Sequence, residues 1–476
     1  MDKKALALLF YWQNKGIDTI VIRIMTRFAI GIVIGAGIAG FLAGGMYFYF
    51  AKSDQGDFSF PFSIKNPLAA SMKESTPEER AAEALARSRN IKGLYMTADV
   101  AMDPGVGASR LRENLIKLAD ETEINGLVID VKEVCGPDYD EERLKKLIGE
   151  LKTKNIWTIG RIVLSKDASQ IDVHPEWYLT RKAGANSGAN ECARKAHIRA
   201  ARPDGKKASV NFWRDRRGGY WMDPAHPEVH AYILEFSKRM IDMGFDELQF
   251  DYIRFPSDGD IENAIYPAYD GKTPKYAVMK EYFEFLNKNL KAHKPEIVLS
   301  ADLFGYAAIR AGDVGIGQRV DDVGDNFDYI SFMTYPSHYY NGLHLPEDPT
   351  RGLPALRYDA VQARTNPDIV VLRTLQVARD FLDGKISTSS FRYITTLSAT
   401  TSTTTISAII EQKSRSRARL RPWLEDFYHE ADATAGRPSG AKKVRMQIDA
   451  AETVDNSGWL LWSAANVYTE DALKKE

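Results

Sequence analysis

The chain has 476 residues, a formal net charge of −1 and an aromatic content of 11%. This length allows one large catalytic domain with additional segments, and the balanced charge gives no overall attraction to nucleic acid. The two cysteines, Cys135 and Cys192, exclude a disulfide framework of more than one bridge and a zinc site built from several cysteines. Their pairing is open, and two unpaired thiols are the simpler expectation.

The N-terminal region contains a segment that predicts a membrane anchor. Residues 28–50 form an uncharged apolar run that is long enough to cross a bilayer as a helix. Basic residues precede the run and two aspartates follow it. The positive-inside rule therefore places residues 1–27 in the cytoplasm and the bulk of the chain on the other side. The run exceeds the apolar core of a typical signal peptide, which favours an uncleaved signal anchor over a removed signal peptide.

A glycine pattern inside this run matches a dinucleotide-binding motif. Residues 35–40 read G-x-G-x-x-G, but they lie in an apolar segment of membrane length rather than between a strand and a helix, so we reject that interpretation. The pairs Gly31/Gly35 and Gly40/Gly44 have the spacing of small residues at contacts between membrane helices. Weak self-association in the membrane could follow, although glycine is simply common in such helices.

Residues 51–90 are predicted to form a linker, since Pro61 and Pro67 interrupt its first part. The sequence from Thr76 to Glu79 provides an N-cap residue, a proline in the first turn and two acids. It predicts the start of a short helix that ends near Arg89.

From residue 91 onward, predicted strands and helices alternate. Apolar segments predict strands at residues 92–97, 126–131, 156–164, 247–255, 297–304, 329–335, 419–427 and 458–464. Amphipathic segments predict helices at residues 108–122, 139–155, 230–243, 276–293, 368–382 and 442–454. Eight such strands predict a (β/α)8 TIM barrel over residues 91–470, with insertions at residues 184–219 and 385–418. A doubly wound open sheet is the alternative, and the count of eight strands argues against it.

The two predicted insertions differ in composition. Nine arginines and lysines lie between residues 194 and 217. They could bind an anionic glycan or a phosphate, although a solvated surface loop is the simpler interpretation. Serine and threonine dominate residues 387–407, which predicts a mobile polar loop.

Polar and aromatic residues gather at the ends of the predicted strands, where such a barrel carries its active site. The residues at these ends are Asp130, Lys132, Arg161, Asp251, Tyr252, Arg254, Asp302, Tyr335, Trp423, Glu425, Asp426, Trp462 and Asn466. Crowded carboxylates push their pKa values apart, so one can stay protonated while another stays ionised. This pattern is typical of glycoside hydrolysis, in which one acid protonates the leaving oxygen and another attacks the sugar or activates water.

Clustered carboxylates could instead hold a divalent metal ion. No histidine lies at a predicted strand end, so we expect no zinc site, and we predict no cofactor. The segments 174–177 and 226–228 contain His-Pro-Glu and are more typical of turns and helix caps than of metal ligands.

Several motifs resemble the glycosyl hydrolase family with a TIM-barrel domain that is known as DUF4015. The motifs are GLVIDVK (126–132), HPEW (174–177), WMDP (221–224), QFDYIRFP (249–256), SFMTYP (331–336), LRPWLEDF (420–427) and GWLLWSAAN (458–466). The resemblance covers residues 91–470, and it implies a barrel of the amylase type. In that layout strand four carries the nucleophile, strand five the acid and strand seven a stabiliser of the transition state.

Transferred to this chain, the layout implies that Asp251 is the nucleophile or base, Asp302 the general acid and Asp426 the stabiliser. The other strand-end residues named above would hold substrate. Two departures stand out. Amylase-type enzymes carry glutamate where this chain has Asp302, and the family usually has glutamine where this chain has Glu425.

We therefore expect a membrane-anchored, extracytoplasmic glycoside hydrolase that acts on a polysaccharide and contacts the lipid bilayer through residues 28–50. A non-catalytic carbohydrate-binding barrel tethered to the cell envelope is the alternative. A metal-assisted hydrolase is a third possibility. No nucleic-acid partner is expected.

Overall fold

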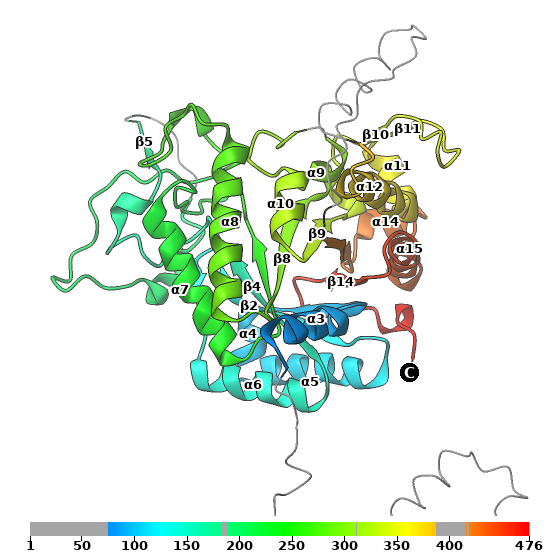
Figure 1. Cartoon of the computed structure of the whole chain (residues 1–476), viewed down its shortest axis with the longest axis horizontal. Coiled ribbons are helices and arrows are strands. Elements are labelled where there is room, and N and C mark those ends of the chain that lie inside the picture. The colour runs from blue at the N-terminus through cyan, green and yellow to red at the C-terminus, as the bar shows by residue number, and fades with distance from the viewer. Residues whose placement is uncertain are drawn as a thin grey trace, which may run out of the picture. The chain divides into compact units, whose positions relative to one another are not determined.

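The computed structural model describes residues 75–182, 184, 189–310, 312–386, 416 and 418–475 (Figure 1). The predicted membrane segment at residues 28–50 and the polar loop at residues 387–407 lie outside these ranges. Within the described ranges, no helix is both long enough and apolar enough to span a bilayer.

Eight parallel strand positions close into a barrel. In spatial order the strands are β1 (Ile91–Met96), β2 (Gly126–Glu133), β4 (Trp157–Val163), β6 (Glu247–Asp251), β8 (Val298–Phe304), β9 (Tyr329–Met333), β13 (Trp423–Glu425) and β14 (Gly458–Trp462). Strand β1 pairs in parallel with both β2 and β14, and these two pairings close the sheet. The predicted barrel is therefore confirmed, and the open doubly wound sheet is wrong.

Two strands differ from the predicted ranges for local reasons. The predicted strand 247–255 ends at Asp251, because Tyr252 adopts a left-handed backbone with a φ of 52°. The predicted strand 419–427 is split into β12 (Arg419–Leu420) and β13. Pro422 lies in the gap and lacks the N–H group that a continuous ladder needs.

The long helices agree with the predicted segments. They are α3 (Pro77–Arg87), which packs against the interior cluster at the amino end of the barrel, and α5 (Val106–Glu121), α6 (Glu141–Thr153), α7 (Pro227–Met243), α8 (Lys275–His293), α12 (Pro367–Leu382) and α15 (Gly440–Glu452), which lie around the barrel (Figure 1). Helix α3 begins with the expected cap, in which Thr76 and Glu79 exchange side-chain and backbone hydrogen bonds.

The sequence analysis missed the short helices and strands, because each spans too few residues for a helical period or a strand alternation to show. The short helices are α4 (Ala98–Met102), α9 (Gly305–Ile309), α10 (Val320–Asn326), α11 (Ala360–Thr365) and α14 (Glu430–Thr434). The short strands are β3 (Gly136–Pro137), β5 (Thr180–Arg181), β7 (Ala264–Ile265), β10 (Leu343–Leu345) and β11 (Leu356–Tyr358).

Alternate residues of each strand enter one of two apolar layers. The outer layer, between strands and helices, includes Leu94, Leu127, Leu248, Leu299, Ile330, Leu424 and Leu461. A smaller cluster is made of the residues of opposite parity, among them Ile91, Tyr95, Val128, Trp157, Val298, Tyr329, Trp423 and Leu460. The second set lines the barrel interior. This parity decides which strand-end side chains can meet one another.

A buried ion pair closes the amino end of the barrel. Arg421 Nη1 lies 2.8 Å from the Oε2 atom of Glu247, and both side chains are fully buried. The remaining donors of Arg421 bond to the carbonyl oxygens of Ser88 and Ser457, and its guanidinium lies 3.7 Å from the ring centroid of Tyr329. One arginine therefore joins β6, β9 and the residues that precede β1 and β14 at this end.

The basic insertion is tied to the barrel by a disulfide bond between Cys135 and Cys192, whose Cα atoms lie 5.5 Å apart. The expectation of two unpaired thiols is therefore wrong. Cys135 follows β2, and Cys192 lies 57 residues later in the insertion. Their spacing in the sequence could not reveal the pair, because only the fold of the intervening chain brings them together.

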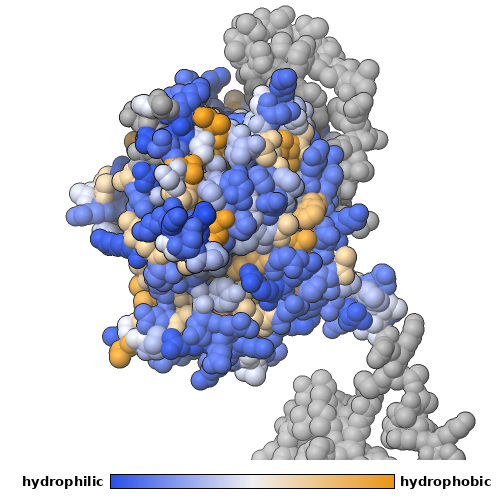
Figure 2. All heavy atoms as spheres, turned by 90° about the vertical axis from the view of Figure 1, so that its left-hand side faces the viewer, coloured by the Kyte–Doolittle hydropathy of each residue, from blue (hydrophilic) through white to orange (hydrophobic). Residues whose placement is uncertain are grey.

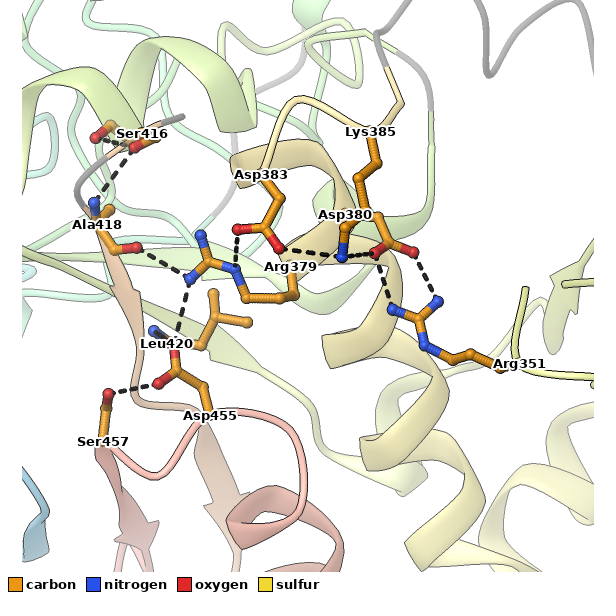
Figure 3. A network of polar contacts seen from close by, with 11 residues as sticks. Arg351, Arg379, Asp380, Asp383, Lys385, Ser416, Ala418, Leu420, Asp455 and Ser457 are labelled. Carbon is orange, nitrogen blue, oxygen red and sulfur yellow. Dashed lines mark hydrogen bonds and ion pairs between the residues drawn. The ribbon is translucent and has the colours of Figure 1, made fainter. Parts of the chain in front are cut away.

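Figure 3 shows a polar network around the residues that flank the second insertion. Arg379, on α12, contacts Asp383 at 3.0 Å and Asp455 at 3.2 Å, and it donates to the carbonyl oxygen of Ala418. Ser416 donates its backbone N–H to Leu382. These contacts hold the carboxyl end of α12 against the amino end of β12.

The outside of the molecule on the α7 side is mostly hydrophilic. Figure 2 shows polar residues over most of this face, with apolar residues scattered singly or in small groups. Such scattered residues are normal on a soluble surface and give no reason to place a partner on this face.

We predict that replacing Arg421 with methionine lowers the free energy of unfolding by about 3–5 kcal/mol, because the carboxylate of Glu247 is left buried without its cation. Urea denaturation of the full chain measures the change. The double variant Glu247→Gln with Arg421→Met removes both charges and should recover part of the loss. A loss below about 1 kcal/mol in the single variant would contradict the prediction.

Candidate active site

One guanidinium organises the carboxylates at the carboxyl ends of the strands. Arg161, on β4, contacts Asp130 of β2 at 2.6 Å, Asp251 of β6 at 2.5 Å and Asp302 of β8 at 3.8 Å. The side chain of Arg161 is 16% exposed, whereas those of Asp130 and Asp302 are each 1% exposed. We refer to these four residues as the Arg161 cluster.

The register of the parallel strands explains why these residues meet. Asp130 and Arg161 are direct partners across β2 and β4. Phe250 and Ala301 are partners across β6 and β8, so the next residues, Asp251 and Asp302, are neighbours on adjacent strands. Strand pairing thus brings together the acids of the second, fourth and fifth strands, whereas the acid of the seventh strand, which was also expected to converge, is described separately below.

Asp302 has the most strongly perturbed environment of the three acids. Its Oδ1 atom accepts a hydrogen bond of 2.8 Å from the indole nitrogen of Trp423. Burial and the neighbouring charge of Asp251 raise the pKa of Asp302 well above its ordinary value, against the opposing effects of Arg161 and Trp423. The buried carboxyl is therefore favoured in its protonated form, which a general acid requires.

Asp251 accepts donors on both of its oxygens. Arg161 contacts Oδ2, and the backbone N–H of Tyr252 donates to Oδ1 at 2.6 Å. The left-handed conformation of Tyr252 accompanies this second bond. A strained residue next to a carboxylate at a strand end is the kind of outlier that marks functional sites.

Tyr95 belongs to the same group, although the sequence analysis did not name it. It lies on β1, and its hydroxyl donates to Oδ2 of Asp130. The guanidinium of Arg161 lies 6.0 Å from its ring centroid. Burial and the charge of Asp130 raise the pKa of Tyr95. Applying the strand-end rule to the first strand as well as to the other seven would have found it.

Aromatic rings surround the Arg161 cluster. Tyr335 stacks on Trp462 with ring centroids 5.8 Å apart, and Phe427 meets Trp462 edge to face at 5.4 Å. Trp423 meets the Tyr95 ring edge-on at 6.3 Å. The structure therefore brings together the predicted Tyr335, Trp423 and Trp462, and it adds Phe427 to them.

Three predicted substrate-binding residues instead have their polar atoms taken up by the protein. Lys132 is fully buried and pairs with Asp167 at 2.9 Å. Glu425 pairs with Lys443 at 3.0 Å, and it also accepts from Ser337. These contacts hold loops and helix α15 against the barrel, and they do not link either residue to the Arg161 cluster.

Asn466 is the third of these residues. Its side-chain oxygen accepts from both the backbone N–H and the hydroxyl of Thr97, each at 3.0 Å. Its side-chain nitrogen donates to the carbonyl oxygen of Ser463, and its φ is 54°. Asn466 thus joins the ends of β14 and β1.

Asp426, the predicted stabiliser on the seventh strand, faces the chain that follows β14. Thr469 donates its hydroxyl at 2.6 Å and its backbone N–H at 2.8 Å to the two carboxylate oxygens of Asp426. Burial raises the pKa of Asp426. In the described part of the chain, no contact joins it to Arg161, so the structure does not place it beside Asp251 and Asp302.

Tyr252 and Arg254 lie beside Asp251, as expected, and they contact residues that the sequence analysis did not name as site residues. The guanidinium of Arg254 lies 5.0 Å from the ring centroid of Trp221 and 4.8 Å from that of Phe304. Lys166 Nζ lies 5.3 Å from the Tyr252 ring centroid. Trp221 and Lys166 lie in the segment that follows β4, outside the strand ends from which the candidates were taken.

Within the described ranges, one group of side chains has the spacing of metal ligands. The ligand atoms of His174, Glu176 and Glu228 lie within 4.8 Å of one another. The backbone N–H of Glu228 donates to His226, the N-cap residue of α7, and His174 stacks on Trp177. The predicted cap role is thus confirmed for His226, whereas His174 precedes the short helical turn Pro175–Trp177 and makes no side-chain cap hydrogen bond.

Comparison with solved structures finds distant relatives. A hypothetical protein from Ruminiclostridium thermocellum ATCC 27405 is 26% identical, with a TM-score of 0.32, and the match covers 44% of this chain and 96% of that one. The alpha-amylase of Geobacillus thermoleovorans is 10% identical, with a TM-score of 0.40 and coverages of 80% and 72%. The spore cortex-lytic enzyme SleL of Bacillus megaterium QM B1551 is 10% identical, with a TM-score of 0.39 and coverages of 81% and 73%.

No protein of curated function matches the sequence. The family model of DUF4015, described as "Putative glycosyl hydrolase domain", matches residues 93–468. This range contains Tyr95, the Arg161 cluster and the surrounding aromatic rings, and the description agrees with the enzyme class expected from the sequence. The chain belongs to the DUF4015 family of glycosyl hydrolase domains.

Proposed function

We propose that the protein hydrolyses glycosidic bonds by paired-carboxylate catalysis, with Asp302 as the general acid and Asp251 as the nucleophile or base. The observation that carries this proposal is the asymmetry between two neighbouring acids. Asp302 is buried and its pKa is raised, whereas Asp251 accepts from Arg161 and from a backbone N–H. Cleavage of a glycosidic bond needs one acid that can give a proton and a second carboxyl group that attacks the sugar or activates water.

The charge of the cluster suits the transition state of this reaction. Arg161 supplies one positive charge against three carboxyl groups. Even without Asp302, two carboxyl groups contact this single guanidinium. The transition state of glycoside hydrolysis resembles an oxocarbenium ion, so a fixed negative charge beside the sugar stabilises it more than the ground state.

Arg161 acts as a positioning residue in this proposal. It bonds Asp130 and Asp251 with separate nitrogens and faces Asp302 with a third. Tyr95 in turn bonds the other oxygen of Asp130. The two reacting carboxyl groups are thereby kept in a fixed relation to each other, which the geometry of a displacement at carbon requires.

The aromatic rings support a polysaccharide as the substrate. Trp462 is partly exposed and stacks on the buried Tyr335, so one face of its ring is backed by another ring. Aromatic faces that lie near paired carboxylates suit the apolar C–H faces of sugar rings. We assign Trp462 and Tyr335 to the walls of a sugar subsite.

The barrel is proposed to act outside the cytoplasm, anchored by residues 28–50. Two observations support this location. The apolar run is long enough to cross a bilayer and has basic residues on its amino-terminal side. The disulfide bond between Cys135 and Cys192 is of the kind that persists in oxidising compartments.

A non-catalytic glycan-binding barrel is the second candidate, and one observation favours it. Asp302 is 1% exposed, which leaves little of its carboxyl within reach of a glycosidic oxygen. The first candidate requires a small movement at the strand ends when sugar binds, whereas the second requires none. Turnover by the wild-type chain distinguishes them.

We predict that Asp251→Asn and Asp302→Asn each lower kcat by about 100-fold to 10,000-fold, because each removes one of the two proton-transferring or attacking groups. Release of reducing ends from a panel of polysaccharides by the full chain measures the effect. Asp449→Asn, at an exposed position on α15, is the control and should keep wild-type activity. Equal release by wild type and Asp251→Asn would reject the assignment, and no release by wild type would favour the binding barrel.

We predict that stability falls with rising pH because of Asp302. Its folded-state pKa lies above the ordinary value of 3.8, so the folded state holds the proton more tightly than the unfolded state does. This contribution is complete below the ordinary value and is lost as the pH rises through the raised folded-state pKa. Activity that depends on the protonated acid should fall over the same range.

The comparison of wild type with Asp302→Asn isolates this contribution. Urea midpoints measured for both chains from about pH 4 to about pH 8 should lie closest together at acid pH, where Asp302 is protonated and resembles the neutral amide, and should separate toward neutral pH as the wild type alone loses stability. Parallel pH profiles of the two chains would show that Asp302 does not have a raised pKa.

A further inference from the structure

A second buried arginine lies beside the Arg161 cluster, and its charge has no matching acid. Arg254 follows Asp251 by three residues and is 7% exposed. Its guanidinium lies between three aromatic rings, 5.0 Å from the centroid of Trp221, 5.1 Å from Tyr252 and 4.8 Å from Phe304. Contacts of this kind offset part of the cost of burying a cation, but they do not neutralise its charge.

The hydrogen bonds of Arg254 leave most of its donors unused. Nη1 donates to the carbonyl oxygen of Phe255 and to the hydroxyl of Ser257, each at 3.1 Å. Among the described residues, Nε and Nη2 have no hydrogen-bond partner, and neither atom is sealed from solvent. A guanidinium presents five N–H donors in a planar fork, so the free edge can hold a two-oxygen anion.

Nearby acids are already bound to other groups. Asp251 contacts Arg161, Asp215 contacts Lys166 at 3.0 Å, and Asp258 accepts from the backbone N–H of Arg216. These three carboxylates act on Arg254 only through space. The other buried arginine at a strand, Arg421, contrasts with it because a glutamate contacts it directly.

The basic insertion adds a second positive group to the same strand ends. Asp215 holds part of the insertion in place. Its carboxylate accepts a hydrogen bond from the indole nitrogen of Trp221 and pairs with Lys166. Arg217, two residues further on, is exposed, and its charge acts on His338, which follows β9. Part of the basic insertion, for which the sequence suggested an anionic glycan or a phosphate, is thus held near the end of β4 by the contact between Asp215 and Lys166.

We propose that Arg254 forms a subsite for the carboxylate of an acidic sugar, so that the substrate is a uronic acid-containing glycan. This inference rests on the proposed glycoside hydrolase function. The planar fork of arginine matches a carboxylate through two parallel hydrogen bonds, and the surrounding rings exclude water from the pair. A bound carboxylate would be the directly bonded anionic partner that the described residues do not provide for Arg254. A neutral sugar would leave the cation buried and unpaired.

The test measures the binding of D-glucuronate, D-glucose and glucose 6-sulfate to the full chain by tryptophan fluorescence, since Trp221 contacts Arg254. Wild type should bind glucuronate at least tenfold more tightly than glucose and more tightly than the sulfate. Arg254→Met should lose roughly tenfold or more in glucuronate affinity, and Arg254→Lys should retain part of it. Arg239→Met is the matched control, because Arg239 also lies over a ring, that of Phe236 on α7, but is exposed.

Two further experiments distinguish a failure of the proposed subsite from a failure of the proposed reaction. Asp251→Asn should lose hydrolysis and keep the preference for glucuronate, so a loss of turnover alone leaves the subsite standing. If Arg254→Met does not fold, the wild type is tested alone. Its affinity is measured for polygalacturonate, alginate and hyaluronan and for the carboxyl-reduced form of each. The reduced forms should bind at least tenfold more weakly. The proposal is overturned by equal affinity of wild type for glucuronate and glucose, by tighter binding of the sulfate, or by an Arg254→Met variant that keeps the preference.

Discussion

The contacts of Arg161 are the constraint on which the candidate site depends. Three carboxyl groups from β2, β6 and β8 lie close together with almost no exposure, and such a group is stable only if a cation or protons offset the repulsion. Arg161 provides one positive charge, which is too little for three ionised acids. Burial, and after it the charge of Asp251, raise the pKa of Asp302. The raised pKa of Asp302 is thus a consequence of its burial next to a second acid, which one guanidinium offsets only in part.

Buried charges are paired at the amino end of the barrel and incompletely paired at its carboxyl end. At the amino end, Arg421 and Glu247 satisfy each other, and backbone carbonyls take up the remaining donors. At the carboxyl end, Arg254 is buried with an open edge and Asp302 is buried beside another acid. The first arrangement stabilises a closed sheet. The second leaves interactions for a bound molecule to complete, which is the physical difference between a structural and a functional buried charge.

Residue type and strand position identified the candidates in the sequence, but they could not rank them. Lys132 and Asp130 end the same strand, and yet Lys132 bonds to Asp167 on a neighbouring loop whereas Asp130 meets Arg161. Glu425 and Asp426 are adjacent, and their partners, Lys443 and Thr469, belong to different segments that follow. Strand parity predicts which face a side chain takes, but not what lies opposite at the end of the strand, where loops replace the regular ladder.

The sequence by itself predicted the barrel, because eight apolar segments separated by amphipathic helices are a local pattern that favours a closed parallel barrel over an open sheet. It also determined that Asp251 and Asp302 lie on neighbouring strands. The tertiary structure alone decided the disulfide between Cys135 and Cys192, the early end of β6 at Tyr252, and the open guanidinium of Arg254. The disulfide joins segments 57 residues apart, whereas the left-handed turn at Tyr252 and the bonds of Arg254 are local, and none of these contacts leaves a periodic pattern in the sequence.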